Sequence, residues 1–281
     1  MKKTQLSKLF ICSIVRNAKK GLRKNIPVIE EIFGSFRSVK VFVYENDSTD
    51  GTKKLLKEWA ERHPSIVNIS LNNNIHVPAS PASPDGVNPF FSRKRIEKMV
   101  FLRNQYLNYV EESGWDGDYL MIVDLDVAEL CAKTILESFQ TSLEWDAVSA
   151  YGYSLSPKLR ERYHDTYAYR KKTVAYSEPQ TEHDIFGSQD DFKSYRLSES
   201  LLPVSSAFGG LAIYRWEAIK GLRYELEPND DDRVEVYCEH RSIYRQMYER
   251  GYCNFFINPC MRIKYQDLTL SLFWKWIKSK F

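Results

Sequence analysis

Strand-length apolar runs alternate with helix-like segments through the first half of this 281-residue chain. The runs Phe10–Val15, Val39–Tyr44 and Ile66–Leu71 are rich in the β-branched and aromatic residues that favour strands. Between them, Val28–Phe33 and Lys53–Arg62 carry apolar residues at helical spacing. This βαβα order predicts an α/β fold with a mixed, largely parallel sheet flanked by helices on both faces.

A further helix and strand follow, and the strand ends in two aspartates. Arg95–Val110 is predicted to be a helix, with Arg103 on the same face as its apolar residues. A charge on an apolar face is unfavourable unless an anionic group meets it. Tyr119–Val123 is then a buried strand that stops at Asp124-Leu125-Asp126.

The second half of the chain is less regular. The proline-containing segment Asn72–Phe91 precedes it and is long for a structureless connection, so we expect a mobile loop over a site. Beyond residue 130 we expect strands at Ala147–Ala150, Leu211–Tyr214, Val234–Cys238 and Phe255–Ile263, and helices near Phe192–Ser198 and Ser242–Arg250.

Charge and cysteine content exclude several classes of protein. The net charge of +3 and the lack of a Lys/Arg block argue against nucleic acid as a partner. Five scattered cysteines predict reduced thiols in a cytoplasmic protein, and neither a disulfide framework nor a zinc site. The apolar run Leu9–Val15 is too short for a signal peptide, so we expect a buried first strand there. No segment has the roughly 20 apolar residues that cross a bilayer, so we expect no transmembrane helix.

Two polar clusters follow predicted strands directly. Glu45–Asp50 comes after the second strand, and Asp124 and Asp126 come after the fourth. Ligands of open parallel sheets bind outside the carboxyl ends of the strands, where both clusters are expected. Two carboxylates can share one Mg²⁺ or Mn²⁺ ion, which in turn binds a diphosphate. The sequence therefore predicts a divalent-metal site at Asp124 and Asp126.

Several segments resemble GT-A glycosyltransferases, which use nucleotide-sugar donors. Tyr44–Thr52 is similar to their nucleotide-binding turn, Ile14–Asn17 to the end of their first strand, and Leu102-Arg103-Asn104 to the Arg-Asn before their Asp-X-Asp motif. More narrowly, His164–Arg170, Ser206–Leu211 and Arg95–Asn104 resemble the fungal capsule-associated α-1,3-mannosyltransferase family. That family commonly has Asn-Asp-Val where this chain has Asp124-Leu125-Asp126.

The resemblance implies a GT-A domain and a glycosyltransferase reaction. We expect a single domain over residues 1–267, with a nucleotide-sugar-binding half (1–130) and an acceptor half (131–267). The donor would be a GDP- or UDP-linked sugar, with mannose implied by the narrower family, and the acceptor a glycan or glycolipid. Retention of configuration follows from that family, whereas an acid at Glu239 suits inversion equally well, so both outcomes stay open.

Roles follow for the residues at the donor's nucleotide. Arg16, Glu45, Asn46 and Asp47 would contact the nucleoside; alternatively the turn is only a helix cap, with Ser48 or Asp50 as N-cap. Arg103 and Asp124 would meet the diphosphate. Alternatively, Arg103 would hold a metal-site carboxylate in place or form only a structural salt bridge.

The acceptor half contributes a second set of residues. Gly209 and Gly210 would let backbone approach the ligand, or form a plain turn. Asp165 would position a sugar, or be a solvated surface residue. Glu239 would act as general base or hydrogen-bond the sugar, and His240 would be a metal ligand or a helix cap.

Two alternatives to glycosyl transfer, and one to a free cytoplasmic protein, remain. A sugar nucleotidyltransferase would begin with a Gly-rich loop, which Arg16–Gly21 lacks. A non-catalytic glycan-binding protein on the same fold would have less need of both Asp124 and Asp126. The amphipathic segment 268–281 mixes Trp, Phe and Lys, so it either docks on the domain or makes a peripheral membrane contact.

Overall fold

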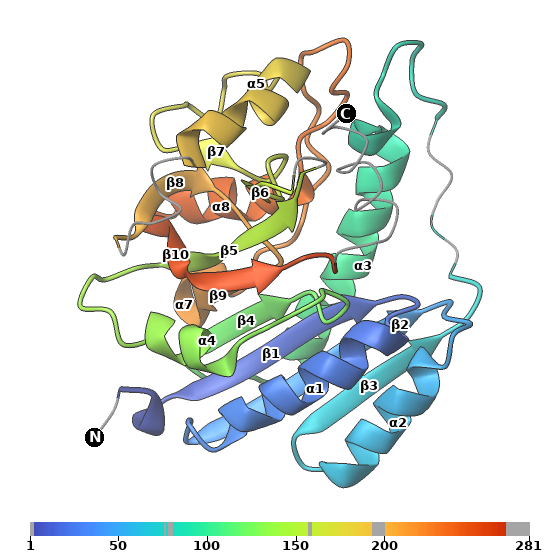
Figure 1. Cartoon of the computed structure of the whole chain (residues 1–281), viewed down its shortest axis with the longest axis vertical. Helices are drawn as coiled ribbons and strands as arrows, with labels where there is room; N and C mark the ends of the chain where they lie inside the picture. The colour runs from blue at the N-terminus through green and yellow to red at the C-terminus, as the bar shows by residue number, and fades with distance from the viewer. Residues whose placement is uncertain (1–2, 76, 78–80, 157–158, 193–199, 268–281) are drawn as a thin grey trace.

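A ten-stranded mixed sheet forms the centre of the molecule (Figure 1). The computed structural model describes residues 3–75, 77, 81–156, 159–192 and 200–267. Its strands are β1 (Lys8–Val15), β2 (Ser38–Asn46), β3 (Val67–Asn72), β4 (Tyr119–Val123), β5 (Ala147–Leu155), β6 (Glu161–Tyr163), β7 (Arg170–Lys171), β8 (Leu202–Ser206), β9 (Leu211–Arg215) and β10 (Phe255–Lys264). Its α-helices are α1 (Lys19–Phe33), α2 (Thr52–Arg62), α3 (Arg93–Glu112), α4 (Ala132–Ser138), α5 (Glu182–Gly187), α7 (Trp216–Ile219) and α8 (Glu239–Glu249), with 3-10 turns η1 (Lys3–Leu6), η2 (Pro89–Phe91) and η3 (Ser188–Asp191).

The strand order is β3-β2-β1-β4-β9-β5-β10-β8-β7, and β6 pairs with β5 outside this path. The pairs β1/β2, β2/β3, β1/β4 and β5/β10 are parallel. Strand β9 lies antiparallel between β4 and β5, and so joins strands from the two halves of the sequence. In Figure 1, α5 and β7 lie at the opposite end of the molecule from α2.

Helices cover both faces of the sheet, as the βαβα order predicts. Side chains at alternate strand positions face opposite sides. Along β1, Leu9 and Ile11 pack with apolar residues of α1, α2 and α4, whereas Phe10 and Cys12 pack with those of α3, α7 and α8. Most side chains of β1, β2 and β4 on these two faces are apolar and buried, which explains why the strands read as nearly continuous apolar runs.

The elements expected in the first half are confirmed, and β4 has the expected bounds. Strands at Ala147–Ala150, Leu211–Tyr214 and Phe255–Ile263 are confirmed as β5, β9 and β10. The strand expected at Val234–Cys238 is wrong, because only a single bridge from Val236 to Pro228 forms there. The helix near Phe192–Ser198 and the segment 268–281 fall on residues outside those described. Within the described ranges, no helix is both long and apolar enough to span a membrane.

The turn after β4, which carries the Asp-X-Asp sequence, is fixed by helix α1. Asn25 is fully buried, and its Nδ2 donates to the carbonyl oxygens of Leu125 at 3.0 Å and Val127 at 2.8 Å. Gly21 of the same helix lies so close that a Cβ there would be 2.6 Å from both Leu125 O and Asp126 Cα. The helix therefore sets the position of the two aspartates through direct backbone contact.

This contact predicts an unusual effect of alanine in a helix. In an open helix, Gly→Ala stabilises by about 0.5–1 kcal/mol, but at Gly21 the added methyl group must displace backbone. We expect Gly21→Ala to lower the free energy of unfolding by about 1–3 kcal/mol, measured by urea denaturation. Gly34→Ala is the control, because nothing lies within 4 Å of its Cβ position. Equal stability of the two variants would contradict the close packing of α1 on the turn.

Candidate active site

A cavity of about 720 Å³ opens beside the carboxyl end of β4. It is lined by charged residues from both halves of the chain and by several aromatic residues. Its lining includes Arg103, Asp124, Asp165, Glu239, His240 and Tyr265, together with Phe90, Phe91, Arg95, Met99, Arg162, Tyr163, His164, Tyr167, Phe186 and Phe208. The structure thus brings together five of the site residues predicted from sequence: Arg103, Asp124, Asp165, Glu239 and His240.

Asp124 occupies the centre of the acidic part of this cavity. Its backbone N–H donates to Gly210 O at 2.8 Å, and its side chain is 22% exposed. Burial raises the pKa of Asp124 to about 8, opposed by Arg103 and reinforced by the negative charges of Asp126, Asp165 and Glu239. Four acidic groups around one arginine therefore leave an excess of negative charge that a cation would offset.

Asp126 differs from Asp124 in its surroundings. It is exposed at the surface of the turn and is not among the residues that line the cavity. Because the pKa of Asp124 is raised in part by Asp126, the two carboxylates are still close enough to interact. The structure therefore places Asp124 in the cavity and Asp126 at its outer side.

Arg103 and Glu239 form a buried ion pair. Nε of Arg103 donates to Oε1 of Glu239 at 2.8 Å, and NH2 lies 3.9 Å from Oδ1 of Asp124. The guanidinium also lies over the ring of Phe208, 4.9 Å from its centroid. Its NH1 has no hydrogen-bond partner within the described part of the chain. The predicted anionic partner of this helix-face charge is therefore Glu239, with Asp124 as a second, longer contact.

His240 lies in the same wall, buried against aromatic rings. Its ring stacks on Phe208 with centroids 3.8 Å apart and meets the edge of Tyr224. Burial, and then the charge of Arg103, lowers the pKa of His240 well below its ordinary value, so the ring is neutral. Both ring nitrogens lack a hydrogen-bond partner among the described residues. A neutral imidazole is the form that ligates metal, and the metal role of His240 stays a prediction.

Asp165 is part of the cavity wall, next to two glycines of which Gly209 bonds its carboxylate. Its Oδ2 accepts the backbone N–H of Gly209 at 3.1 Å, while Gly210 O accepts from Asp124. Both glycines have positive φ, 65° and 86°, which favours glycine. A Cβ on Gly209 would lie 2.1 Å from Ala150 O, so the close approach is to the protein's own backbone. Gly209 is therefore packed against the protein's own backbone, and a close contact of Gly209 and Gly210 with a ligand stays a prediction.

In the turn after β2, the acidic side chain of Glu45 bonds the protein's own backbone. Glu45 is fully buried, and its oxygens accept from Ser48 N at 2.7 Å and Asn72 N at 3.3 Å. Asn46 is 3% exposed. The Glu45 carboxylate therefore holds the turn, and a nucleoside contact from Glu45 stays a prediction. The expected N-cap at Ser48 or Asp50 is wrong, because Gly51 is the N-cap of α2.

Two loops at this edge hold each other. Asn17, with φ of 51°, donates from its N–H to Ser48 Oγ and accepts Thr49 N–H at its Oδ1. Asp47, also with positive φ, accepts from Ile75 N. Desolvation acts to raise the pKa of Asp47, but this backbone hydrogen bond and, to a smaller extent, the charge of the exposed Arg16 lower it below its usual range. Arg16 and Asp47 are therefore the two predicted nucleoside residues that remain accessible here.

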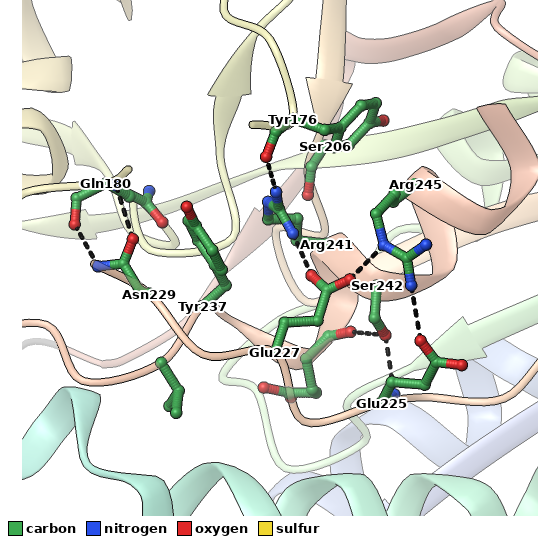
Figure 2. A network of polar contacts seen from close by, with 12 residues as sticks. Tyr176, Gln180, Ser206, Glu225, Glu227, Asn229, Tyr237, Arg241, Ser242 and Arg245 are labelled. Atoms are coloured by element: carbon green, nitrogen blue, oxygen red, sulfur yellow. Dashed lines mark hydrogen bonds and ion pairs between the residues drawn. The ribbon is translucent and has the colours of Figure 1, made fainter. Parts of the chain in front are cut away.

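A polar network behind the cavity positions the start of α8 (Figure 2). Glu227 pairs with both Arg241 and Arg245 of this helix, and the ring of Tyr237 lies 3.8 Å from the Arg241 guanidinium. Ser242 Oγ donates to Glu239 O and accepts from Glu225 N. This network explains why Glu239 begins a helix where a strand end was expected.

His164 and Tyr265 are among the cavity residues that sequence reasoning missed. His164 stacks on Tyr265 with centroids 3.9 Å apart, between Asp165 and the end of β10. Burial lowers the pKa of His164 to about 4, so it is neutral at pH 7. The segment His164–Arg170 resembles the mannosyltransferase family, and this resemblance could have pointed to His164. Tyr265 had none, because its place in the cavity depends on the β10/β5 pairing.

The acidic residues fit a divalent cation, although the chain alone does not enclose one. No group of three or more His, Cys, Asp or Glu residues in the described ranges is arranged as a metal site. Neither side-chain oxygen of Asp124 accepts a hydrogen bond from the described residues; its closest cation is Arg103, at 3.9 Å. Mg²⁺ and Mn²⁺ sites in phosphate-binding proteins commonly use one or two carboxylates, with substrate phosphates and water as the other ligands. Asp124 and Asp126 supply that donor set.

Comparison with solved structures identifies the fold. The mannosyltransferase PcManGT from Pyrobaculum calidifontis, in complex with GDP-Man and Mn²⁺, matches with a TM-score of 0.50 and 13% identity over 94% of this chain and 58% of that one. TarS 1–349 of S. aureus in complex with UDP matches with a TM-score of 0.49 and 11% identity over 96% of this chain and 63% of that one. The chain thus spans less than two thirds of either protein. The match to PcManGT identifies the fold as the GT-A fold of glycosyltransferases.

The family is narrower than the fold. A profile of the family described as Cryptococcal mannosyltransferase 1 matches residues 8–253, and the chain belongs to this family. No curated protein sequence shows significant similarity to this chain. The resemblance to the fungal mannosyltransferases is therefore confirmed.

The buried ion pair gives a stability prediction. Replacing Arg103 by Met leaves Glu239 buried without its partner, which typically costs about 3–5 kcal/mol. We expect the double variant Arg103→Met, Glu239→Leu to recover a large part of that loss, because no charge is then stranded. Urea denaturation of wild type, both single variants and the double variant measures the coupling. Additive losses would show that the two side chains do not depend on each other.

Proposed function

We propose that the protein transfers mannose from GDP-mannose to a hydroxyl group of a glycan, with a divalent cation at Asp124. The observation that carries the proposal is the meeting of Asp124, Arg103, Asp165 and Glu239 in one cavity at the carboxyl edge of the sheet. Membership of a family described as a mannosyltransferase supports the sugar. The complex of PcManGT with GDP-Man and Mn²⁺ supports the nucleotide and the cation.

The metal and nucleotide would occupy the edge where β1, β2 and β4 end. Asp124 and Asp126 would hold Mn²⁺ or Mg²⁺, and such a cation, when bound, stabilises charge on a diphosphate and on the departing nucleotide. Arg16 and Asp47 would contact the nucleoside, because both lie beside the ends of β1 and β2 and are not fully buried.

Arg103 would stabilise negative charge that develops during transfer. Its guanidinium is fixed by Glu239 and Phe208, so it needs no reorganisation when the charge appears. The free NH1 is the donor available to a ligand oxygen. Glu239, held by Arg103, would orient that guanidinium and accept a hydrogen bond from the sugar.

Asp165 would take the proton of the acceptor. In the reaction, the bond from the anomeric carbon to the phosphate oxygen breaks and a bond from the acceptor oxygen to that carbon forms. The hydroxyl proton must pass to a base, and of the two candidate carboxylates Glu239 is already bonded to Arg103. Burial raises the pKa of Asp165, and its Oδ2 is oriented by Gly209. Both features suit proton transfer near neutral pH.

Metal-dependent nucleotide binding is the first test. We expect GDP to raise the melting temperature by several degrees in the presence of Mn²⁺ and by much less without it, since a ligand at 100 times its Kd stabilises by about 2.7 kcal/mol. Asp124→Asn and Asp126→Asn should each remove the Mn²⁺-dependent part. Asp230→Asn, on an exposed acidic turn, is the control. If no nucleotide stabilises the wild type with metal, the proposal is wrong and a glycan-binding protein becomes the better interpretation.

The role of Asp165 is tested separately from binding. We expect Asp165→Asn to lower the turnover of GDP-mannose at saturating donor by about 100-fold or more, the scale of acid–base catalysis. GDP affinity with Mn²⁺, measured by calorimetry, should change by less than about threefold. A variant with near wild-type turnover would exclude Asp165 as the proton acceptor.

A further inference from the structure

Two exposed phenylalanines stand at the cavity that contains the catalytic carboxylates. Phe90 in η2 is 56% exposed and Phe186 in α5 is 60% exposed. Burying a ring of this size is strongly favourable, so exposed rings at a cavity need an explanation. Among the described residues, the other strongly exposed aromatic side chain is Tyr248, which lies outside this cavity.

Both rings are held in place by a common support. The buried ring of Phe91 lies 5.7 Å from Phe90 and 6.0 Å from Phe186, centroid to centroid. Asn88 Nδ2 donates to Glu182 Oε1 at 2.7 Å, which joins η2 to the start of α5, and Asn88 Oδ1 accepts from Phe90 N. The two exposed rings are therefore part of one ordered structure, and their exposure is not a consequence of loose packing.

Hydrogen-bonding groups surround these rings. The guanidinium of Arg95 lies 4.3 Å from the centroid of Phe90 and donates to its carbonyl oxygen. The exposed Arg162 lines the same cavity, as does His164. Flat apolar faces beside planar polar groups match a sugar ring, which has an apolar C–H face and a rim of hydroxyl groups.

We infer that Phe90 and Phe186 form the acceptor subsite, in which they stack on sugar rings of the glycan that receives the new residue. This inference rests on the proposed function for the chemistry and adds the place where the acceptor binds. The same cavity contains Asp165, so a sugar held against the rings is in the compartment where its hydroxyl would be deprotonated.

A lipid chain is the competing occupant of an exposed aromatic pair. A lipid site would need a continuous apolar lining, because alkyl chains cannot satisfy polar groups. Here the rings share their cavity with Arg95, Arg162 and Asp165, as well as the buried Arg103–Glu239 pair. The lining therefore favours a carbohydrate over a lipid.

The test separates acceptor binding from donor binding. The probe is an α-linked mannotriose, titrated against the full chain by saturation-transfer NMR, with GDP and Mn²⁺ titrated in parallel by calorimetry. We expect the double variant Phe90→Ala, Phe186→Ala to raise the Kd for mannotriose by about tenfold or more, because each stacked ring contributes of the order of a few-fold. The Kd for GDP with Mn²⁺ should change by less than about twofold.

Two controls address the aromatic character and the position. Phe186→Trp keeps a stacking face and should bind mannotriose within about threefold of wild type. Tyr248→Ala removes an equally exposed ring, 53% exposed, away from the cavity and should change neither affinity. Circular dichroism of all variants should be unchanged, because the substituted side chains are largely solvent-exposed.

Several outcomes would overturn the inference. These are no mannotriose binding by wild type, unchanged binding by the double variant, or an equal loss of GDP affinity. If the double variant loses a binding to phosphatidylcholine vesicles that wild type shows, while its mannotriose affinity is unchanged, the rings form a lipid site instead. If wild type binds mannotriose through the rings but never binds GDP, the inference survives and the proposed transfer reaction fails.

Discussion

The buried ion pair between Arg103 and Glu239 is the interaction on which the rest of the site depends. It joins α3, from the first half of the sequence, to the first residue of α8, from the second. Burying two charges costs several kcal/mol per ion, so the pair is tolerated only where geometry and neighbouring groups compensate. Here one arginine faces Glu239 at 2.8 Å and Asp124 at 3.9 Å, with Asp126 and Asp165 nearby. The site is thus built with too few positive charges for its carboxylates, which is the electrostatic condition for holding a cation.

The backbone around this pair is tied together by close contacts that exclude side chains. Gly21 lets α1 touch the turn at Asp126, and Gly209 lets its loop touch Ala150. These contacts act on different acids: the first fixes the outer aspartate, and the second brings the amide that orients Asp165. Catalytic groups need to be held within a fraction of an ångström by the residues that support them. The glycines meet that need by allowing backbone to contact backbone directly.

The sequence was informative where local pattern and function coincide. β4 and Asp124 were predictable because a buried strand stops abruptly at an acid, and Arg103 because a charge on an apolar helix face requires a partner. The identity of that partner was not predictable, since Glu239 is 136 residues away in the sequence. The segment before Glu239 has a strand-like sequence but forms only an isolated bridge, between Val236 and Pro228. Glu45 was expected to face the nucleoside for a similar reason, because local sequence does not show which way its side chain points. An acidic turn has the same sequence whether its carboxylate faces a ligand or, as here, two backbone amides.

The cavity has two chemically different sides, and they come from different kinds of structure. The charged side is formed by β4, α3 and the start of α8, whose positions are fixed by the sheet and by the network around Glu227. The aromatic side is formed by η2 and α5, two short elements held by the bond between Asn88 and Glu182. Short connecting elements tolerate change better than sheet strands do. With the proposed acceptor subsite on the aromatic side, substitutions there would alter which acceptor fits while the charges around Arg103 stay in place. The proposed donor chemistry and acceptor choice would then vary independently on this fold.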